Sequence, residues 1–149
     1  MKKVRLIILF LLLLSLTVRS QESILSKEIA FVKAEAFSQN FQSPQEDTLQ
    51  LSRQSHFVLP ENSFEKGFIY YWVVFVDGCA DCPFKLRYRN SSSSDYYPLD
   101  ATLKSSDSLQ RIEYTFQKMD DENINLEAFL EANSDAILYS LLFKKENQD

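Results

Sequence analysis

The two cysteines are the most reactive side chains of the sequence, and they lie three positions apart. Cys79 and Cys82 form a C-x-x-C pair in the segment 78–83, directly after a strongly apolar run. In an exported protein two cysteines most simply form one disulfide, which would staple the turn between two strands. A zinc site would need further ligands at matching spacing, and the sequence supplies none, so we expect no metal. A redox-active pair is the alternative.

The apolar run that leads into this pair resembles the active-site segment of the thioredoxin family over residues 73–82. The resemblance implies a thiol–disulfide oxidoreductase in which Cys79 attacks and a helix starting at the motif lowers its pKa. Beyond the motif the sequence departs from that family, because residues 84–90 alternate as a strand and no βαβ pattern surrounds the pair. A helix beginning at Cys79 would favour the redox alternative, whereas an all-β sandwich would oppose it.

The remaining candidates for catalysis are the single histidine and a run of carboxylates. His56 falls on the polar phase of a predicted strand, and no G-x-S-x-G nucleophile motif accompanies it, so we expect it to face solvent. The carboxylates at 120–122 are expected to form a solvated turn, although a glycosidase would need two such groups across a cleft. Two isolated glycines cannot build a phosphate loop. We therefore expect no catalytic residues, no cofactor and no enzymatic activity.

Tyrosines after a serine-rich loop suggest binding. Tyr96 and Tyr97 follow the serines at 91–94 and precede a polar segment. Adjacent strand residues point to opposite faces, so at least one of the two should be exposed. Exposed aromatic faces stack on sugar rings, which makes Tyr88, Tyr96 and Tyr97 the candidate saccharide-binding residues. The alternative is that Tyr96 and Tyr97 only pack at a corner of the fold.

Period-two alternation predicts the strands that would position these residues. Apolar and polar residues alternate at 84–89, 111–117, 124–131 and 137–143, and less cleanly at 49–59. Residues 97–104 are predicted to form an edge strand, because Pro98 is tolerated only at the edge or the start of a strand. Residues 68–76 are apolar on both faces, which predicts a central strand covered on both sides. The segment 23–41 is ambiguous, because it fits either a helix capped by Ser23 or Ser26 or a strand over 30–37. With that strand the count is about eight, which predicts an all-β, antiparallel two-sheet sandwich of jelly-roll type.

The N-terminal segment predicts export. Residues 1–20 combine the basic Lys2, Lys3 and Arg5 with an apolar run and a small residue before Gln21, the pattern of a cleaved secretory signal peptide. The expected product, 21–149, is a single periplasmic or extracellular β-sandwich domain with its core at about 27–145. It would carry 12 basic against 21 acidic residues, a net charge of −9. This charge argues against nucleic acid as a partner, and no second apolar run predicts stable membrane insertion after cleavage.

The C-terminal third resembles the last three strands of galactose-binding-like jelly rolls, a group that includes many carbohydrate-binding modules. The matching stretches are 108–116, 123–132 and 135–139, and 68–76 looks like the central strand of that group. The resemblance implies a secreted, non-catalytic module that recognises a glycan. A structural calcium is not implied, because Tyr139-Ser140-Leu141 stands where calcium-binding members have an aspartate. The alternative is a structural component of the cell envelope that docks a protein partner through an exposed edge or apolar patch. The sequence fixes neither the ligand nor the oligomeric state.

Overall fold

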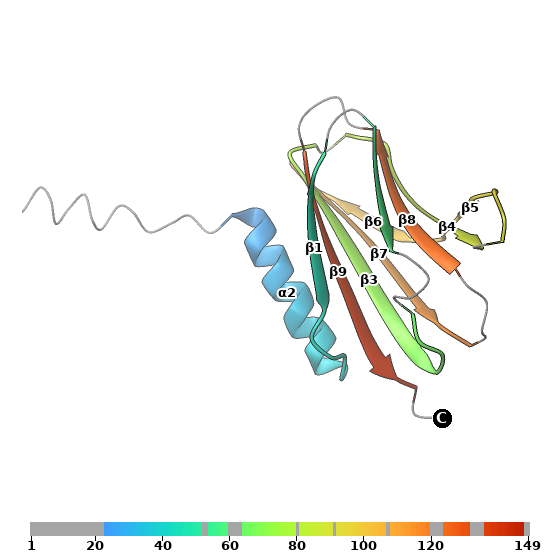
Figure 1. The fold of residues 1–149 in the computed structure, drawn as a ribbon. Coiled ribbons are helices and arrows are strands. Elements are labelled where there is room, and N and C mark those ends of the chain that lie inside the picture. Colours follow the sequence, from blue (N-terminus) through green and yellow to red (C-terminus); the bar gives the residue numbers. More distant parts are fainter. Residues whose placement is uncertain are drawn as a thin grey trace, which may run out of the picture.

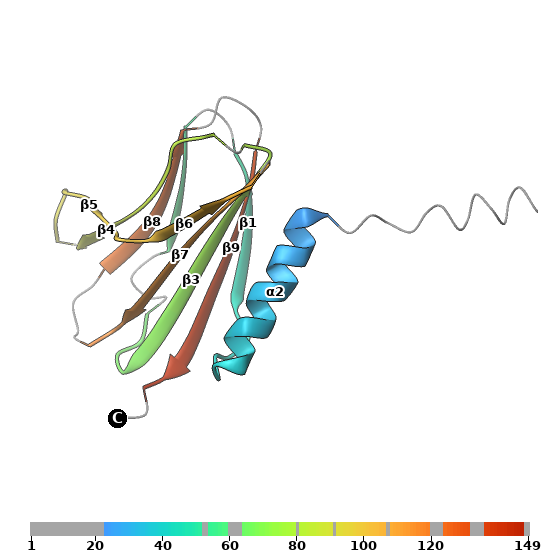
Figure 2. The same cartoon turned by 180° about the vertical axis from the view of Figure 1, so that it is seen from behind.

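The computed structural model describes residues 23–51, 54–59, 64–79, 81–90, 92–106, 108–119, 124–131 and 136–147. Within these ranges one helix and nine strands form two antiparallel sheets (Figures 1 and 2). The all-β, two-sheet architecture predicted from the alternation is confirmed. The predicted signal peptide at 1–20 and the carboxylates at 120–122 lie outside the described residues. No helix of the described part is both long and apolar enough to cross a membrane.

The order of strands is that of a jelly roll with one added edge strand. Sheet A has the order β1 (Gln45–Gln50), β9 (Ile137–Glu146), β3 (Phe68–Asp77), β7 (Leu109–Gln117) and β6 (Thr102–Ser105). Sheet B has the order β2 (Gln54–Leu59), β8 (Ile124–Glu131), β4 (Phe84–Asn90) and β5 (Tyr97–Pro98). The chain crosses between the sheets at most connections, so neighbouring strands come from distant parts of the sequence. The short β6 extends sheet A as the hairpin partner of β7.

The central strand β3 is covered on both faces, as its sequence predicts. Trp72, Val74 and Val76 point into the space between the sheets and pack against sheet B. Val73 and Phe75 point to the other side and belong to a second apolar cluster. Both clusters are almost fully buried. Strand β3 is hydrogen-bonded to β7 on one side and β9 on the other, which makes it the middle of sheet A.

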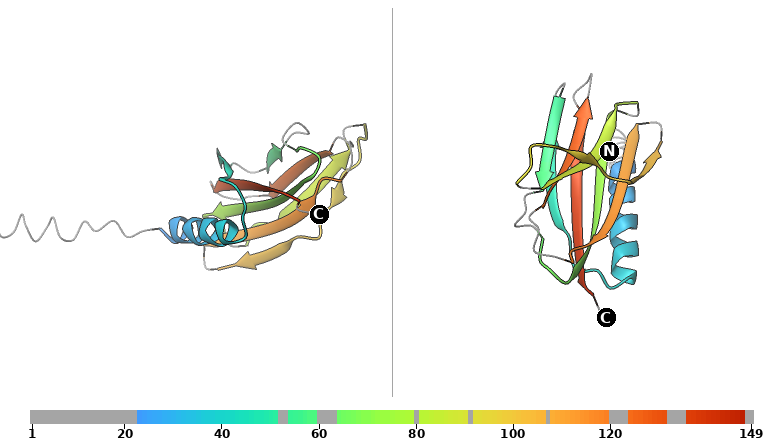
Figure 3. Two further views of the ribbon diagram at one scale, coloured as in Figure 1. Left: turned by 90° about the horizontal axis from the view of Figure 1, so that it is seen from below. Right: turned by 90° about the vertical axis from the view of Figure 1, so that its right-hand side faces the viewer.

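The segment 23–41, whose sequence fits either a helix or a strand, contains a helix, α2 (Ile24–Ser38). This helix covers the face of β3 that points away from sheet B. The Ser23 side chain caps it by accepting a hydrogen bond from the backbone N–H of Ser26. Four side chains at helical spacing turn towards sheet A, namely Leu25, Ile29, Val32 and Ala36. Figures 1 and 3 show the helix outside the sandwich, along sheet A. The alternation at 30–37 that also fits a strand is therefore not used, because one stripe of the helix covers the apolar outer face of sheet A.

Two segments that were each expected to form one strand contain parts of two strands, one in each sheet. Residues 49–59 supply the end of β1 in sheet A and the whole of β2 in sheet B. The buried Leu51 lies at the crossing, where its backbone N–H donates to the carbonyl of Ala136. Residues 97–104 divide in the same way into β5 and β6, each at the edge of its sheet. Local alternation continues through both crossings, so it does not reveal the change of sheet.

The packing of α2 predicts a sharp difference between two residues of the same helix. Val32→Asp should lower the free energy of unfolding by about 3 kcal/mol or more, because Val32 is fully buried against sheet A and a charge there has no partner. Ala34→Asp places the same charge on the exposed side of α2 and should cost less than about 1 kcal/mol. Urea unfolding of both variants measures the difference. Equal losses would contradict the packing of α2 on sheet A.

Candidate functional site

The two outer faces of the sandwich differ in what covers them. On sheet A the outer face packs against α2. On sheet B the outer face has no described helix or strand over it (Figures 1 and 2). The side chains of β2, β8 and β4 that do not point into the core lie on this face. A ligand that binds a sheet face of this fold therefore has sheet B available.

A row of planar side chains crosses the outer face of sheet B. It contains, in spatial order, His56, Phe129, Arg87, Tyr96 and Arg89, and we call it the planar row. The His56 and Phe129 ring centroids are 4.9 Å apart, and the Arg87 guanidinium carbon lies 4.8 Å from the Phe129 centroid. The same carbon lies 4.0 Å from the Tyr96 centroid, and that of Arg89 lies 5.2 Å from it. The row thus alternates π-faces with groups that donate hydrogen bonds.

Cross-strand pairing builds this row. His56 lies opposite Phe129 in the β2–β8 ladder, and Arg87 lies opposite Glu127 in the β4–β8 ladder. Residues opposite each other in a sheet point to the same face, so each pair contributes two neighbouring side chains. Tyr96 lies directly before β5, at the edge of sheet B, and its ring contacts Arg87 and Arg89 of β4.

A buried carboxylate lies beneath the row. The side chain of Glu127 is only 2% exposed, although it lies on the outer face of sheet B. Its Oε2 accepts a hydrogen bond from Nε of Arg87 at 2.7 Å, and its Oε1 accepts one from Nη2 at 3.1 Å. Nδ1 of His56 contacts Oε1 as well. Because Nδ1 is used in this way and the His56 side chain is 49% exposed, Nε2 is the ring nitrogen that does not contact Glu127.

The charge of Glu127 is set by its partners rather than by its burial. Burial disfavours the charged form, but the hydrogen bonds from Arg87 and His56 outweigh it and hold the pKa of Glu127 below its ordinary value. The same hydrogen bond raises the pKa of Arg87. The ionised Glu127 therefore fixes the orientation of Arg87 and His56 before any ligand arrives.

The three tyrosines predicted from the sequence do not lie together. Tyr96 is exposed and belongs to the planar row. Tyr88 and Tyr97 lie opposite each other in the β4–β5 ladder, with ring centroids 5.3 Å apart, and Tyr88 packs on the core between the sheets. Tyr88 also lines a pocket of about 310 Å³ together with Tyr114 and Phe116. Tyr96 lies directly before β5 and contacts Arg87, whereas Tyr97 is the first residue of β5 and pairs with Tyr88.

The sequence interpretation missed most of the planar row. It placed His56 correctly on an exposed strand face, but Glu127, Arg87, Arg89 and Phe129 entered it only as members of alternating strands. The one available signal was that polar positions of two predicted strands carry an arginine and a glutamate. Without the pairing of β4 with β8 that signal does not bring the two charges together.

The cysteine pair lies in an irregular turn between β3 and β4. Cys79 and Cys82 form a disulfide. The buried Gln110 holds the turn, because its Nε2 donates to the carbonyl of Cys79 at 2.8 Å and to that of Cys82 at 2.9 Å. Strand β4 begins at Phe84, where the thioredoxin resemblance would require a helix. The local geometry therefore fits a structural staple rather than a redox centre.

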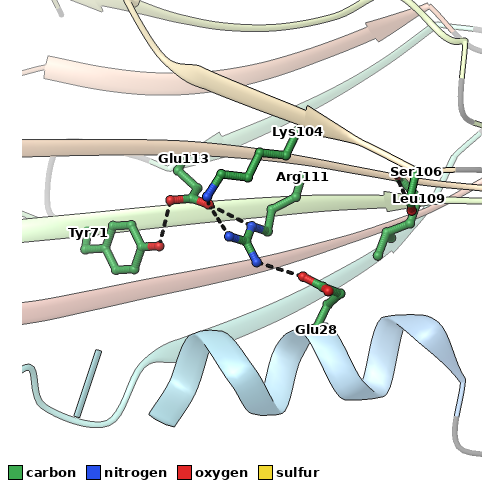
Figure 4. A network of polar contacts seen from close by, with 7 residues as sticks. All are labelled: Glu28, Tyr71, Lys104, Ser106, Leu109, Arg111 and Glu113. Carbon is green, nitrogen blue, oxygen red and sulfur yellow. Dashed lines mark hydrogen bonds and ion pairs between the residues drawn. The ribbon is translucent and has the colours of Figure 1, made fainter. Parts of the chain in front are cut away.

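A second polar network lies on the covered side of the molecule (Figure 4). Arg111 bridges Glu28 of α2 and Glu113 of β7, with nitrogen–oxygen distances of 2.7 Å to each. Lys104 and Tyr71 also donate to Glu113, at 2.9 Å and 3.0 Å. Burial raises the pKa of Tyr71, so its hydroxyl stays protonated and acts as a donor. This network ties α2 to sheet A.

Among the described residues, no group of three or more His, Cys, Asp or Glu side chains could hold a metal ion.

Comparisons with known proteins add little to this geometry. No protein-family profile and no curated protein matches the sequence. Among solved structures, the CBM22-1–GH10 modules of the Clostridium thermocellum endo-1,4-beta-D-xylanase 10B, in complex with xylohexaose, are similar with a TM-score of 0.41 and 14% identity. The match covers 71% of this chain and 22% of that chain. The chain thus spans about a fifth of that protein, and the low TM-score carries no functional assignment.

The ion pair beneath the planar row predicts a pH dependence. Because the pKa of Glu127 is lower in the folded protein than in the unfolded chain, the ionised group stabilises the fold above about pH 4.5, and this contribution is lost as the pH falls through the folded pKa. Glu127→Gln should cost about 1–3 kcal/mol at pH 7, with the difference from wild type shrinking below pH 4. Urea unfolding between pH 3 and pH 7 measures it. A difference that stays constant with pH would contradict the ion pair.

The disulfide predicts a modest effect on stability alone. Replacing both cysteines, Cys79→Ser with Cys82→Ser, should lower the free energy of unfolding by about 1–2 kcal/mol, because the closed loop is very short. The melting temperature should fall by roughly 2–8 °C. Thermal unfolding followed by circular dichroism measures the shift. Loss of ligand binding with unchanged stability would instead indicate a chemical role for the pair.

Proposed function

We propose that the chain is a secreted, non-catalytic saccharide-binding module that holds its ligand on the outer face of sheet B. The observation that carries this proposal is the planar row with its buried carboxylate. Sugar rings offer apolar C–H faces and a rim of hydroxyl groups. Aromatic π-faces meet the C–H faces, and planar polar side chains give directional hydrogen bonds to the hydroxyls. Both kinds of group alternate along one exposed sheet face.

The rigidity of the row supports binding. Arg87 is held by two hydrogen bonds to Glu127 on one side and by the rings of Phe129 and Tyr96 on the others. His56 is held by Glu127 and Phe129. Side chains fixed in advance lose little conformational entropy when a ligand binds, which matters for shallow sites with few contacts.

The same contacts argue against hydrolysis at this face. A glycosidase needs one carboxyl group that can give up a proton and a second one facing it across the bond. Glu127 is buried, its oxygens are bound by Arg87 and His56, and its lowered pKa keeps it ionised at neutral pH. A carboxylate in this state orients its neighbours and does not protonate a leaving group.

A protein-interaction role is the second candidate, and it has a different surface. Helix α2 exposes three large apolar side chains, Ile24, Phe31 and Phe37. Such residues on an outer helix are typical of a docking surface when they form one patch. The two functions use opposite sides of the molecule, so variants of the planar row distinguish them.

Two adjacent tyrosines provide the test and its control. In a glycan-array screen of the purified, oxidised protein, Tyr96→Ala should weaken binding of the recognised glycan by about tenfold, because Tyr96 offers a ring to the outer face of sheet B. Tyr97→Ala removes an equally exposed ring that is paired with Tyr88 instead, and it should leave binding within about twofold.

The array has two outcomes that contradict the proposal. Loss of binding in Tyr97→Ala but not in Tyr96→Ala would move the ligand to the pocket beside Tyr88. No binding to any glycan would favour the interaction role through α2.

A further inference from the structure

Arg89 differs from the other members of the planar row in its charge balance. It lies on β4 two residues after Arg87, so both guanidinium groups point to the outer face of sheet B. Glu127 neutralises Arg87. Arg89 has no ion-pair partner among the described residues, and its contact is with the ring of Tyr96.

One atom of Arg89 has an unmet hydrogen bond. Its Nε is buried, and it has no hydrogen-bond partner among the described residues. A buried donor without a partner is unfavourable, and few such groups occur in folded proteins. The guanidinium donors point in a fixed fork that matches the two oxygens of a carboxylate. An acidic group bound beside Tyr96 would meet the terminal nitrogens of this fork, and its negative charge would neutralise the guanidinium as a whole.

The charges along β4 also favour an acidic ligand. The outward positions of β4 are Lys85, Arg87 and Arg89, three basic residues on one strand face. The whole chain is acidic, with a net charge of −5. Because Glu127 neutralises Arg87, Lys85 and Arg89 leave a local positive charge on this face of an acidic protein, which favours binding of an anion there.

We propose that the saccharide bound by the planar row carries a uronic acid and that Arg89 binds its carboxylate. The inference rests on the proposed function and names the class of ligand for the same face. The sugar ring lies against Tyr96, and its carboxylate accepts hydrogen bonds from the terminal nitrogens of the Arg89 guanidinium. Arg87 and His56, oriented by Glu127, bind hydroxyl groups of the same ligand.

The experiment compares acidic saccharides with their neutral counterparts. Hexasaccharides of polygalacturonate, alginate and hyaluronan are prepared in native form and with their carboxyl groups reduced to alcohols, which keeps the ring and linkage but removes the charge. Binding to the full chain is measured by calorimetry at low salt, together with a neutral glycan array. We expect at least one native oligosaccharide to bind ten times more tightly than its reduced form.

Variants assign the effect to Arg89. Arg89→Gln should abolish the preference for the native form without lowering the melting temperature, because Arg89 holds no ion pair in the described part of the fold and its buried Nε has no partner there. Arg89→Lys keeps the charge without the fork and should retain only part of the preference. Lys27→Gln removes one positive charge from exposed α2 and serves as the matched control, which should behave as wild type.

The outcomes separate the two proposals. Equal binding of native and reduced forms, binding of neutral glycans alone, or a preference that survives Arg89→Gln would overturn the acidic ligand while leaving saccharide binding in place. Binding to neither the acidic set nor the neutral array would overturn both. A preference lost equally in Lys27→Gln would show a general charge effect, and it would also overturn the role of Arg89.

Discussion

The two apolar faces of β3 are the constraint on which the rest of the structure depends. A ten-residue strand with large apolar side chains on both sides is stable in water only between two covering layers. Sheet B supplies one layer, towards which Trp72 of β3 points. The indole N–H of Trp72 donates a hydrogen bond to Oγ of Ser140 at 2.9 Å. Helix α2 supplies the other. Because the helix covers the outer face of sheet A, the outer face of sheet B is the one with no described helix or strand over it.

The two outer faces carry similar chemistry in different surroundings. On sheet A, Glu113 is bound by Arg111, Lys104 and Tyr71, and Arg111 continues to Glu28 on the helix. That network is closed by α2 and holds the layers together. On sheet B, Glu127 is likewise bound by an arginine, but the row above it meets solvent. A polar network that ends at a free surface has hydrogen-bonding capacity left for a ligand.

The side chains of the planar row are held in place by contacts within the fold, but one hydrogen-bond donor of the row has no partner among the described residues. Glu127, Arg87 and His56 satisfy one another, so their positions are fixed by contacts within the fold. Arg89 is fixed by its strand and by the Tyr96 ring, yet its buried Nε has no partner among the described residues. The positive charge of Arg89 also lacks an ion-pair partner among the described residues, so an acidic group bound beside Tyr96 would neutralise it. An acidic saccharide fits this part of the planar row better than a neutral one.

Three features could be predicted from the amino-acid sequence: the all-β class, the central place of β3 and the turn that the disulfide closes. These features depend on local alternation or on cysteines three positions apart, and both can be read within a few residues. The identity of 23–41 depended on tertiary packing, because its residues fit a helix and a strand alike until the apolar face of sheet A had to be covered. The crossings near Leu51 and between β5 and β6 were also invisible in the alternation. The candidate site could not be predicted in this way, because the register of β2, β8 and β4 joins His56, Glu127 and Arg87 across long stretches of chain. Packing also places Tyr96 against Arg87 and Tyr97 against Tyr88, although the two tyrosines are adjacent in the sequence.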